Sequence, residues 1–254
     1  MSISDLNIVI MAGGEGKRMN SNIPKVLHNF QNVPILVRII KESYILKPSK
    51  IIIITGKYDN IIKIFLKDNL SDEMYNNLTF VNQVIPNGTG DAIKCTLEHL
   101  NIESNVLILN GDMPLITSNI LSKFIYDDAN NIAKLLIAKL DNPYGYGRII
   151  MNKDNEFISI REEKDCNSEE KDIKLVNAGI YFFSAKILKK YIPLITNINV
   201  QNEYYLTDII QIIKNDTNII NITTYIIDSK YNFQIKGINT KKELELLENE
   251  FSCI

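Results

Sequence analysis

Apolar residues along this chain gather in short runs, and amphipathic stretches separate one run from the next. The runs at residues 8–11, 50–55 and 105–109 are dominated by Ile, Val and Leu and have the length of one strand. Continuous runs of this kind are typical of strands that are covered on both faces of a sheet. The stretches between them place apolar residues three or four positions apart, which favours helices. The pattern therefore predicts alternating strands and helices in the first half of the chain.

The same criteria predict an order of elements for the whole chain. In the first half, the predicted strands are 8–11, 50–55, 78–84, 105–109 and 133–140, and the predicted helices are 34–43, 60–66, 90–100 and 118–126. In the second half, the pattern predicts a hairpin of 148–151 with 157–161, a polar surface loop at 165–172, strands at 175–183, 219–227 and 233–237, and helices at 184–191, 204–214 and 240–251. This alternation predicts an α/β fold with a mixed, mostly parallel sheet, helices on both faces and a small added β lobe.

The composition is that of an ordinary globular protein, with 254 residues, 45% of them hydrophobic and 23% charged. Because no linker or repeat interrupts the chain, we expect residues 1–254 to form a single domain. The net charge of −2 argues against nucleic acid as a partner. The apolar runs are too short to span a membrane and the polar start lacks a signal peptide, so we expect a cytoplasmic protein. Cys95, Cys166 and Cys253 lie far apart, which fits a reducing compartment and offers no metal spacing.

The first apolar run ends in a glycine-rich segment, residues 12–16, with the sequence Ala-Gly-Gly-Glu-Gly. Glycines allow a tight turn and leave backbone N–H groups open to a ligand, and such N–H groups attract anions. Arg18 and Lys25 follow. The planar guanidinium group of Arg18 and the flexible ammonium group of Lys25 both suit phosphate binding. Because ligands of such sheets lie at the carboxyl ends of strands, the segment predicts a nucleotide-phosphate site. A simple turn after a strand is the alternative.

The longer string around this loop narrows the choice of phosphate site. The dinucleotide fingerprint would need a third glycine and a later acidic residue, and a P-loop would need a closing Gly-Lys-Ser/Thr. Neither is present here. Residues 14–28 instead follow the pattern G-x-G-x-R-M-x-S-x-x-P-K-V-L-H. This string resembles the pyrophosphorylase domain of bacterial N-acetylglucosamine-1-phosphate uridylyltransferases, within the sugar-nucleotidyltransferase superfamily, and the resemblance extends from Leu6 to about Phe251.

The resemblance implies a Rossmann-like nucleotidyltransferase fold in which the late β lobe lies on the sugar side. It implies transfer of uridylyl from UTP to N-acetylglucosamine-1-phosphate, with Mg²⁺ as the cofactor and UDP-N-acetylglucosamine and pyrophosphate as products. Arg18 and Lys25 become the expected catalytic residues. The loop residues expected to hold the nucleotide are Ala12, Gly13, Gly14 and Gly16.

Asp112 and Asn239 are the expected magnesium ligands, and Asp112 also counts among the nucleotide contacts that the resemblance implies. Asp112 follows the apolar run at 105–109, and Asn239 follows the predicted strand at 233–237. Their hard oxygen atoms suit Mg²⁺, which commonly takes only one or two protein ligands beside water and phosphate. A turn at Asp112 and a helix N-cap at Asn239 are the alternatives.

Three residues in and just after the predicted strand at 78–84 are expected to form the site for uracil. The resemblance assigns this role to Gln83, Gly88 and Thr89, and a Gln amide carries the donor and the acceptor that a pyrimidine edge requires. A turn that leads into a helix is the alternative for 88–90. The family usually has His after the second glycine, where this chain has Asp91, so small details of the nucleotide pocket differ.

Several motifs of the second half resemble the family's sugar-binding segments. They are Gly-Tyr-Gly-Arg-Ile at 145–149, Glu-Glu-Lys-Asp at 162–165, Val-Asn-Ala-Gly at 176–179 and Glu-Tyr-Tyr-Leu-Thr-Asp at 203–208. A solvated surface is the alternative for each of the charged residues. The residues expected to bind the sugar phosphate are Gly147, Glu162, Asn177, Tyr204 and Lys164.

The resemblance stops where that family usually continues into a left-handed β-helix acetyltransferase domain, so we expect no acetylation of glucosamine-1-phosphate. The sequence does not predict an oligomeric state. Two alternatives to the expected reaction stay open. The same chemistry could act on another sugar-1-phosphate such as glucose-1-phosphate, or the chain could be a catalytically silent nucleotide-binding subunit, because a fold alone does not establish activity.

Overall fold

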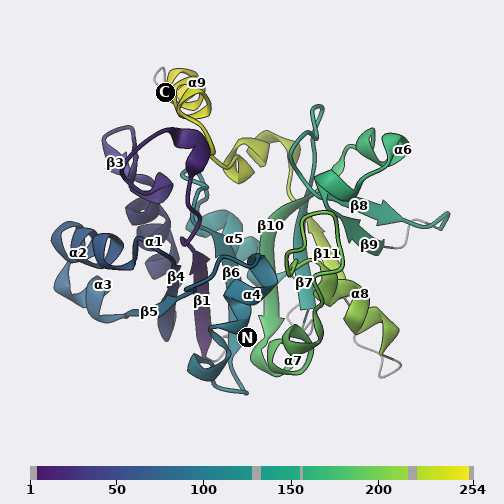
Figure 1. The fold of residues 1–254 in the computed structure, drawn as a ribbon, viewed down its shortest axis with the longest axis horizontal. Helices are drawn as coiled ribbons and strands as arrows, with labels where there is room; N and C mark the ends of the chain where they lie inside the picture. The colour runs from purple at the N-terminus through teal and green to yellow at the C-terminus, as the bar shows by residue number, and fades with distance from the viewer. Residues whose placement is uncertain (1–4, 128–132, 155–156, 217–221, 252–254) are drawn as a thin grey trace.

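The computed structural model describes residues 5–127, 133–154, 157–216 and 222–251 (Figure 1). Within these ranges a nine-stranded sheet has the central order β11-β7-β10-β6-β1-β4-β5, with β8 paired to β10 and β9 paired to β8. The strands are β1 (Leu6–Met11), β4 (Lys50–Thr55), β5 (Leu78–Asn82), β6 (Asn105–Asn110), β7 (Ala133–Lys139), β8 (Arg148–Met151), β9 (Phe157–Arg161), β10 (Leu175–Ser184) and β11 (Ile222–Ile226), and β2 (Asn29–Phe30) with β3 (Val33–Pro34) forms a separate two-stranded sheet.

The described helices are of two kinds. The α-helices are α1 (Ile35–Ile45), α2 (Asp59–Asn69), α3 (Asp72–Asn76), α4 (Thr89–Lys94), α5 (Ser118–Tyr126), α6 (Ser168–Lys171), α7 (Ala185–Tyr191), α8 (Asp208–Asn215) and α9 (Lys241–Phe251). The 3-10 helices are η1 (Lys17–Met19), η2 (Lys25–Leu27), η3 (Leu97–His99), η4 (Glu163–Asp165), η5 (Ile192–Leu194) and η6 (Ser229–Ile235). In the described ranges no helix is both long enough and apolar enough to cross a membrane.

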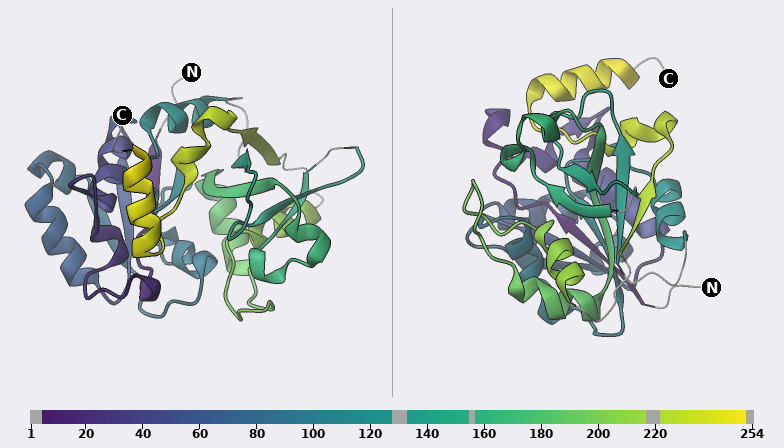
Figure 2. Two further views of the ribbon diagram at one scale, coloured as in Figure 1. Left: turned by 90° about the horizontal axis from the view of Figure 1, so that it is seen from above. Right: turned by 90° about the vertical axis from the view of Figure 1, so that its right-hand side faces the viewer.

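Helices cover both faces of the sheet, as the sequence predicts (Figure 2). Successive side chains of a strand point to opposite faces. In β1, Ile8 and Ile10 accordingly join one hydrophobic cluster with α1, α2 and α5, whereas Val9 joins a second cluster with α4, α7 and α8. Burial on both faces explains why the central strands read as continuous apolar runs.

The sheet is mixed because one long strand, β10, runs antiparallel between β6 and β7. The predicted hairpin is confirmed, since β8 and β9 pair antiparallel and β8 also pairs with β10. The last helix, α9, lies near the hairpin of β2 and β3 (Figure 1). The backbone N–H of Gln31 donates to Glu248 of α9 at 2.8 Å, which joins the last helix to the turn between β2 and β3.

Four predicted segments differ from the structure. The predicted strand at 233–237 lies partly in η6, which Asp228 starts by accepting a hydrogen bond from the Lys230 N–H. The predicted loop at 165–172 contains α6, closed by a capping box between Asn167 and Glu170. The predicted helix at 90–100 is divided into α4 and η3. The predicted helix at 204–214 begins only at Asp208, because the backbone of Tyr204 is already bonded to residues 87 and 90.

Two other predicted segments and one cysteine include residues that the structure does not describe. The turn between β8 and β9 includes residue 155, and the start of the predicted strand at 219–227 falls within 217–221. Cys253 also lies outside the described residues. The short elements α3, β2 and β3 have no counterpart in the sequence prediction, because each contains five residues or fewer and shows little periodicity.

Candidate active site

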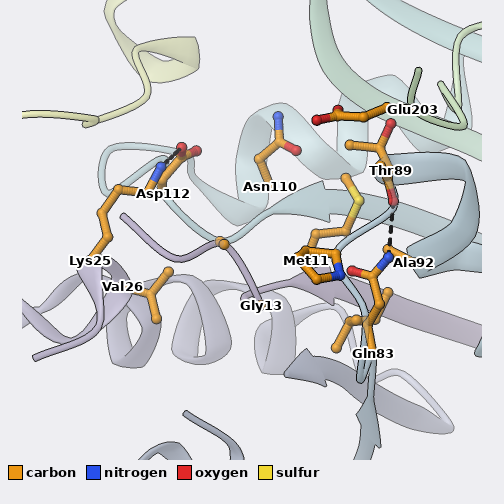
Figure 3. Close-up of a pocket in the computed structure, with 15 residues that line it drawn as sticks. Met11, Gly13, Lys25, Val26, Gln83, Thr89, Ala92, Asn110, Asp112 and Glu203 are labelled. Atoms are coloured by element: carbon orange, nitrogen blue, oxygen red, sulfur yellow. Dashed lines mark hydrogen bonds and ion pairs between the residues drawn. The ribbon is translucent and has the colours of Figure 1, made fainter. Parts of the chain in front are cut away.

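A cleft of about 300 Å³ opens where β1, β4 and β6 end (Figure 3). The parallel register pairs Met11 of β1 with Asn110 of β6, so the loops that follow these two strands start side by side. The cleft is therefore placed at the carboxyl edge of the sheet, where ligands of such folds bind. Its lining consists of Met11, Gly13, Gly14, Lys25, Val26, Ile54, Gln83, Pro86, Gly88, Thr89, Ala92, Asn110, Gly111, Asp112 and Glu203.

An ion pair between Lys25 and Asp112 forms one end of the cleft (Figure 3). Lys25 Nζ donates to Asp112 Oδ2 at 2.5 Å and to Asn239 Oδ1 at 3.0 Å. The two side chains of the ion pair are only 14% and 19% exposed, so their charges act with little screening by water. Three residues far apart in the sequence are thus brought to one point.

Asn239 reaches this point through the backbone of the segment before α9. The N–H of Ile238 donates to the carbonyl of Asp112 at 2.9 Å. The N-cap of α9 is Thr240, whose Oγ1 accepts from the Glu243 N–H at 3.1 Å. The alternative of Asn239 as the cap is therefore wrong, and so is the expectation that it follows a strand, because η6 precedes it.

Asp112 and Asn239 fit a hard divalent cation. Both present an oxygen atom to the same ammonium group, so the two oxygens already face one position that favours positive charge. In the part of the chain that the structure describes, no group of three or more His, Cys, Asp or Glu residues could hold a metal ion. A cation bound here would complete its shell with water and substrate oxygens, which is the usual habit of Mg²⁺.

The remaining residues of the glycine loop are not equivalent. Gly13 and Gly14 line the cleft. Ala12 does not, and its N–H donates to the carbonyl of Ile54 at 2.9 Å, so this N–H is already satisfied by the sheet. Gly16 backs onto Lys25, because a Cβ added at Gly16 would lie 2.8 Å from the Lys25 Cβ. Arg18 lies on η1, is exposed and is absent from the cleft lining, so its catalytic role stays a prediction.

The opposite end of the cleft carries the three residues predicted to read the base (Figure 3). The amide nitrogen of Gln83 donates to the carbonyl of Gly88 at 3.1 Å. Gly88 has a φ of 109°, and a Cβ there would lie 2.6 Å from the carbonyl oxygen of Tyr204, so only glycine fits. Thr89 Oγ1 accepts from the Leu206 N–H at 3.0 Å. The loop before α4 is thus held against residues 204–206.

Three of the predicted sugar contacts come together on the β lobe. The Asn177 N–H donates to the carbonyl of Gly147 at 2.8 Å, which joins β10 to the segment before β8. A Cβ added at Gly147 would lie 3.5 Å from Glu162 Oε2. Glu162 Oε1 accepts from Thr207 Oγ1 at 2.8 Å, and Asn177 Nδ2 donates to the Tyr181 hydroxyl at 2.6 Å.

Burial gives this lobe unusual titration behaviour. Burial raises the pKa of Glu162; the hydrogen bond from Thr207 opposes this rise, and the charge of Asp208 adds to it. Burial also raises the pKa of Tyr146 to about 12, and the charge of Asp112 contributes. Tyr146 therefore lies close enough to Asp112 for this charge to act on its hydroxyl.

Two predicted sugar contacts lie apart from this group. Lys164 is exposed, and its Nζ is hydrogen-bonded to Gln201. The Tyr204 side chain packs, partly buried, on the hydrophobic cluster that includes Ile93 and Ile195. Its backbone supports the nucleotide end instead, because its carbonyl accepts from the Gly90 N–H at 2.7 Å. A sugar contact by either residue stays a prediction.

Sequence reasoning missed several residues that the structure places at the site. Asn110 and Glu203 line the cleft, and Thr207 hydrogen-bonds to Glu162. The signal for Asn110 was present, since it is the polar residue that closes the apolar run of β6. Glu203 and Thr207 belong to the motif at 203–208, from which only Tyr204 was expected at the site.

Gly179 positions Asn110, and we expect Gly179→Ala to destabilise the protein. Gly179 has a φ of 73° within the irregular part of β10, and a Cβ there would overlap Asn110 Nδ2. Left-handed backbone costs a non-glycine residue about 1–3 kcal/mol. Urea denaturation should show a loss of this size, whereas Gly14→Ala, whose Cβ would meet nothing within 4 Å, should lose less. Equal losses in the two variants would contradict the steric role of Gly179.

Comparison with known proteins identifies the family of the chain. Residues 7–225 match the family described as nucleotidyl transferase. The chain is 43% identical over 248 residues to a protein named as a probable UDP-N-acetylglucosamine pyrophosphorylase from Acanthamoeba polyphaga mimivirus, covering 96% of this chain and 95% of that protein. It is 38% identical over 250 residues to the bifunctional protein GlmU of Legionella pneumophila, covering 96% of this chain but 52% of that protein, so it spans about half the length of this relative.

The fold is also found among solved structures. A UDP-glucose pyrophosphorylase complexed with UDP-glucose superposes with a TM-score of 0.73 at 16% identity, covering 98% of this chain and 99% of that chain. At this identity the similarity concerns the fold alone, and it confirms the Rossmann-like architecture. The family match covers most of the chain, and the first relative aligns along nearly its full length. The chain therefore belongs to the nucleotidyl transferase family.

Proposed function

We propose that this protein transfers the uridylyl group of UTP to N-acetylglucosamine-1-phosphate, giving UDP-N-acetylglucosamine and pyrophosphate. The observation that carries the proposal is the polarity of the cleft, with Lys25 and Asp112 at one end and the Gln83 amide at the other (Figure 3). A nucleoside triphosphate has the same polarity, since its base hydrogen-bonds and its phosphates carry charge. The name of the mimivirus relative supports the choice of sugar.

The reaction is a direct displacement at the α-phosphorus of UTP. A phosphate oxygen of the sugar-1-phosphate forms a bond to this phosphorus, and the bond to the bridging oxygen of the β-phosphate breaks, which releases pyrophosphate. The attacking phosphate is already ionised near neutral pH, so no general base is needed. The barrier consists of charge repulsion and alignment, and holding two reactants in line can supply up to roughly 7–11 kcal/mol.

The residues at the charged end would divide this work. The N–H groups of Gly13 and Gly14, together with Arg18, would hold the β- and γ-phosphates. Lys25 would neutralise the charge that shifts towards the leaving pyrophosphate. Asp112 and Asn239 would hold Mg²⁺, which when bound neutralises the charge shared by the two reacting phosphates.

The sugar would bind beside the β lobe, where Gly147, Glu162 and Asn177 come together. Carboxylate and amide groups hydrogen-bond sugar hydroxyls and an acetamido group. We place the reaction in the cytoplasm and on residues 1–254 acting as one catalytic domain. Cys95 and Cys166 are free thiols, which fits a reducing compartment.

The proposal is tested by pyrophosphate release from the purified protein with UTP and Mg²⁺. N-acetylglucosamine-1-phosphate should support release at a far higher kcat/KM than glucose-1-phosphate, and UTP without a sugar phosphate should give none. Release mainly with glucose-1-phosphate would support uridylyl transfer but refute N-acetylglucosamine-1-phosphate as the substrate. If neither sugar supports release while calorimetry shows that UTP binds, the chain is a silent nucleotide-binding subunit.

A further inference from the structure

We infer that Asp91 is a positioning residue that fixes the Gln83 amide in one orientation, and so sets the preference for uracil over cytosine. The inference rests on the proposed function and concerns the position at which this chain departs from the family it resembles. Gln83 is only 9% exposed. Its Nε2 donates to Asp91 Oδ2 at 2.8 Å and to the Gly88 carbonyl at 3.1 Å.

These two hydrogen bonds account for both donors of the amide. An NH₂ group has two hydrogens to give, and an ionised carboxylate or a carbonyl can only accept. Rotating the amide by half a turn would place Gln83 Oε1 against two acceptors. The buried amide nitrogen would then lose both of its hydrogen bonds, which raises the free energy of this orientation. The orientation is therefore locked, and Oε1 is the atom that Gln83 can offer to a base.

An offered acceptor discriminates between pyrimidines. Uracil carries an N–H at position 3 and can donate to Gln83 Oε1, whereas cytosine has an unprotonated nitrogen there and would meet Oε1 as a second acceptor. A site built to hydrogen-bond one ligand rejects a ligand that leaves its polar group unpaired. Without Asp91, only the Gly88 carbonyl would oppose the flipped amide, which presents a donor to cytosine.

The position of Asp91 is itself well fixed. It lies in the first turn of α4, directly after Gly90, whose N–H donates to the Tyr204 carbonyl at 2.7 Å. Thr89, at the start of the same turn, accepts from the Leu206 N–H at 3.0 Å. The segment at 204–206 therefore fixes the backbone of the turn that carries Asp91, and so holds this residue beside Gln83.

The test compares dissociation constants for UTP and CTP, measured by calorimetry without a sugar phosphate, in the wild type and Asp91→Ala. The ratio of the CTP constant to the UTP constant should fall about tenfold, which corresponds to the loss of one hydrogen bond to a charged group. Asp91→Asn keeps the shape and an acceptor, and it covers the case that the alanine variant fails to fold. Its ratio should fall by a similar factor, since an Asn amide can pair with Gln83 in either orientation and only the Gly88 carbonyl would still oppose the flipped amide.

Glu98→Gln is the matched control, because it also removes one negative charge near α4 but its carboxylate is exposed and faces His99. Its ratio should equal that of the wild type. A structural role for Asp91 would weaken UTP and CTP equally, and an unchanged ratio in folded Asp91 variants would overturn the inference. Failure of the proposed function is seen separately, since a wild type that does not prefer UTP over CTP contradicts the assigned nucleotide before any variant is made.

Discussion

Replacing Lys25 by alanine should lower kcat for pyrophosphate release by about 10²–10³, the usual effect of removing one group that stabilises developing charge. The Lys25 side chain is 14% exposed, and its ammonium group lies at the charged end of the cleft, where water screens it little. No other lysine or arginine lines the described cleft, so the structure offers no ready substitute. The measurement is steady-state turnover at saturating UTP and N-acetylglucosamine-1-phosphate.

Lys57→Ala is the control for this variant. Lys57 also lies beside the glycine loop, where its Nζ approaches Glu15 Oε1 at 3.1 Å, but its side chain is half exposed. Exposed ion pairs of this kind contribute little, so turnover should stay within a few-fold of the wild type. Thermal denaturation shows whether both variants fold. Turnover of folded Lys25→Ala close to that of the control would remove Lys25 from the catalytic residues.

Most of the sheet could be predicted from the sequence because its strands are buried on both faces. The β-branched run of β4 has no polar alternation, and Ile51 and Ile52 pack into opposite hydrophobic clusters. Such a run can be satisfied only by helices on each side. The pattern of β1, β4 and β6 therefore contained both the strands and the layers that cover them.

Long-range hydrogen bonds explain most of what the pattern could not predict. The periodicity from residue 204 onwards is helical, but the Tyr204 backbone is taken up by Asn87 and Gly90, so α8 starts at Asp208. In η6, the Asp228 side chain turns the chain before an apparently alternating stretch. Asn87 and Gly90 are too far from Tyr204 in the sequence to be read from local propensity, whereas the cap at Asp228 is a local signal that the alternating pattern of 233–237 concealed.

In the candidate site, too, contacts within one motif could be predicted, whereas contacts between distant segments could not. Residues within one motif, such as Gly14 and Lys25, could be placed together from the string that contains them. The contact of Lys25 with Asn239 joins positions 214 residues apart and depends on the Ile238 backbone bonding to Asp112. The bond between Gln83 and Asp91 could not be predicted either, because the resembled pattern has a different residue at 91.

Asp112→Asn should lower kcat by about 10²–10³ and raise the Mg²⁺ concentration needed for half-maximal turnover. The substitution keeps the size of the side chain and an oxygen that can accept from Lys25, but it removes the negative charge that attracts a divalent cation. Asp68→Asn, an exposed change on α2, is the matched control and should leave both quantities unchanged. Full turnover of the Asp112 variant at the same Mg²⁺ concentration would contradict its assignment as a ligand.

Metal binding in the absence of nucleotide distinguishes the role of Asp112 from that of Lys25. The affinity for the metal should rise in Lys25→Ala and fall in Asp112→Asn. Lys25 Nζ lies 2.5 Å from Asp112 Oδ2 and 3.0 Å from Asn239 Oδ1, so the ammonium group competes with a cation for these oxygens. Titration with Mn²⁺ followed by electron paramagnetic resonance should show tighter binding to Lys25→Ala and weaker binding to Asp112→Asn than to the wild type. Equal affinity in all three proteins would place the metal away from Asp112 and Asn239, and a phosphate-bound cation would then act without a protein carboxylate.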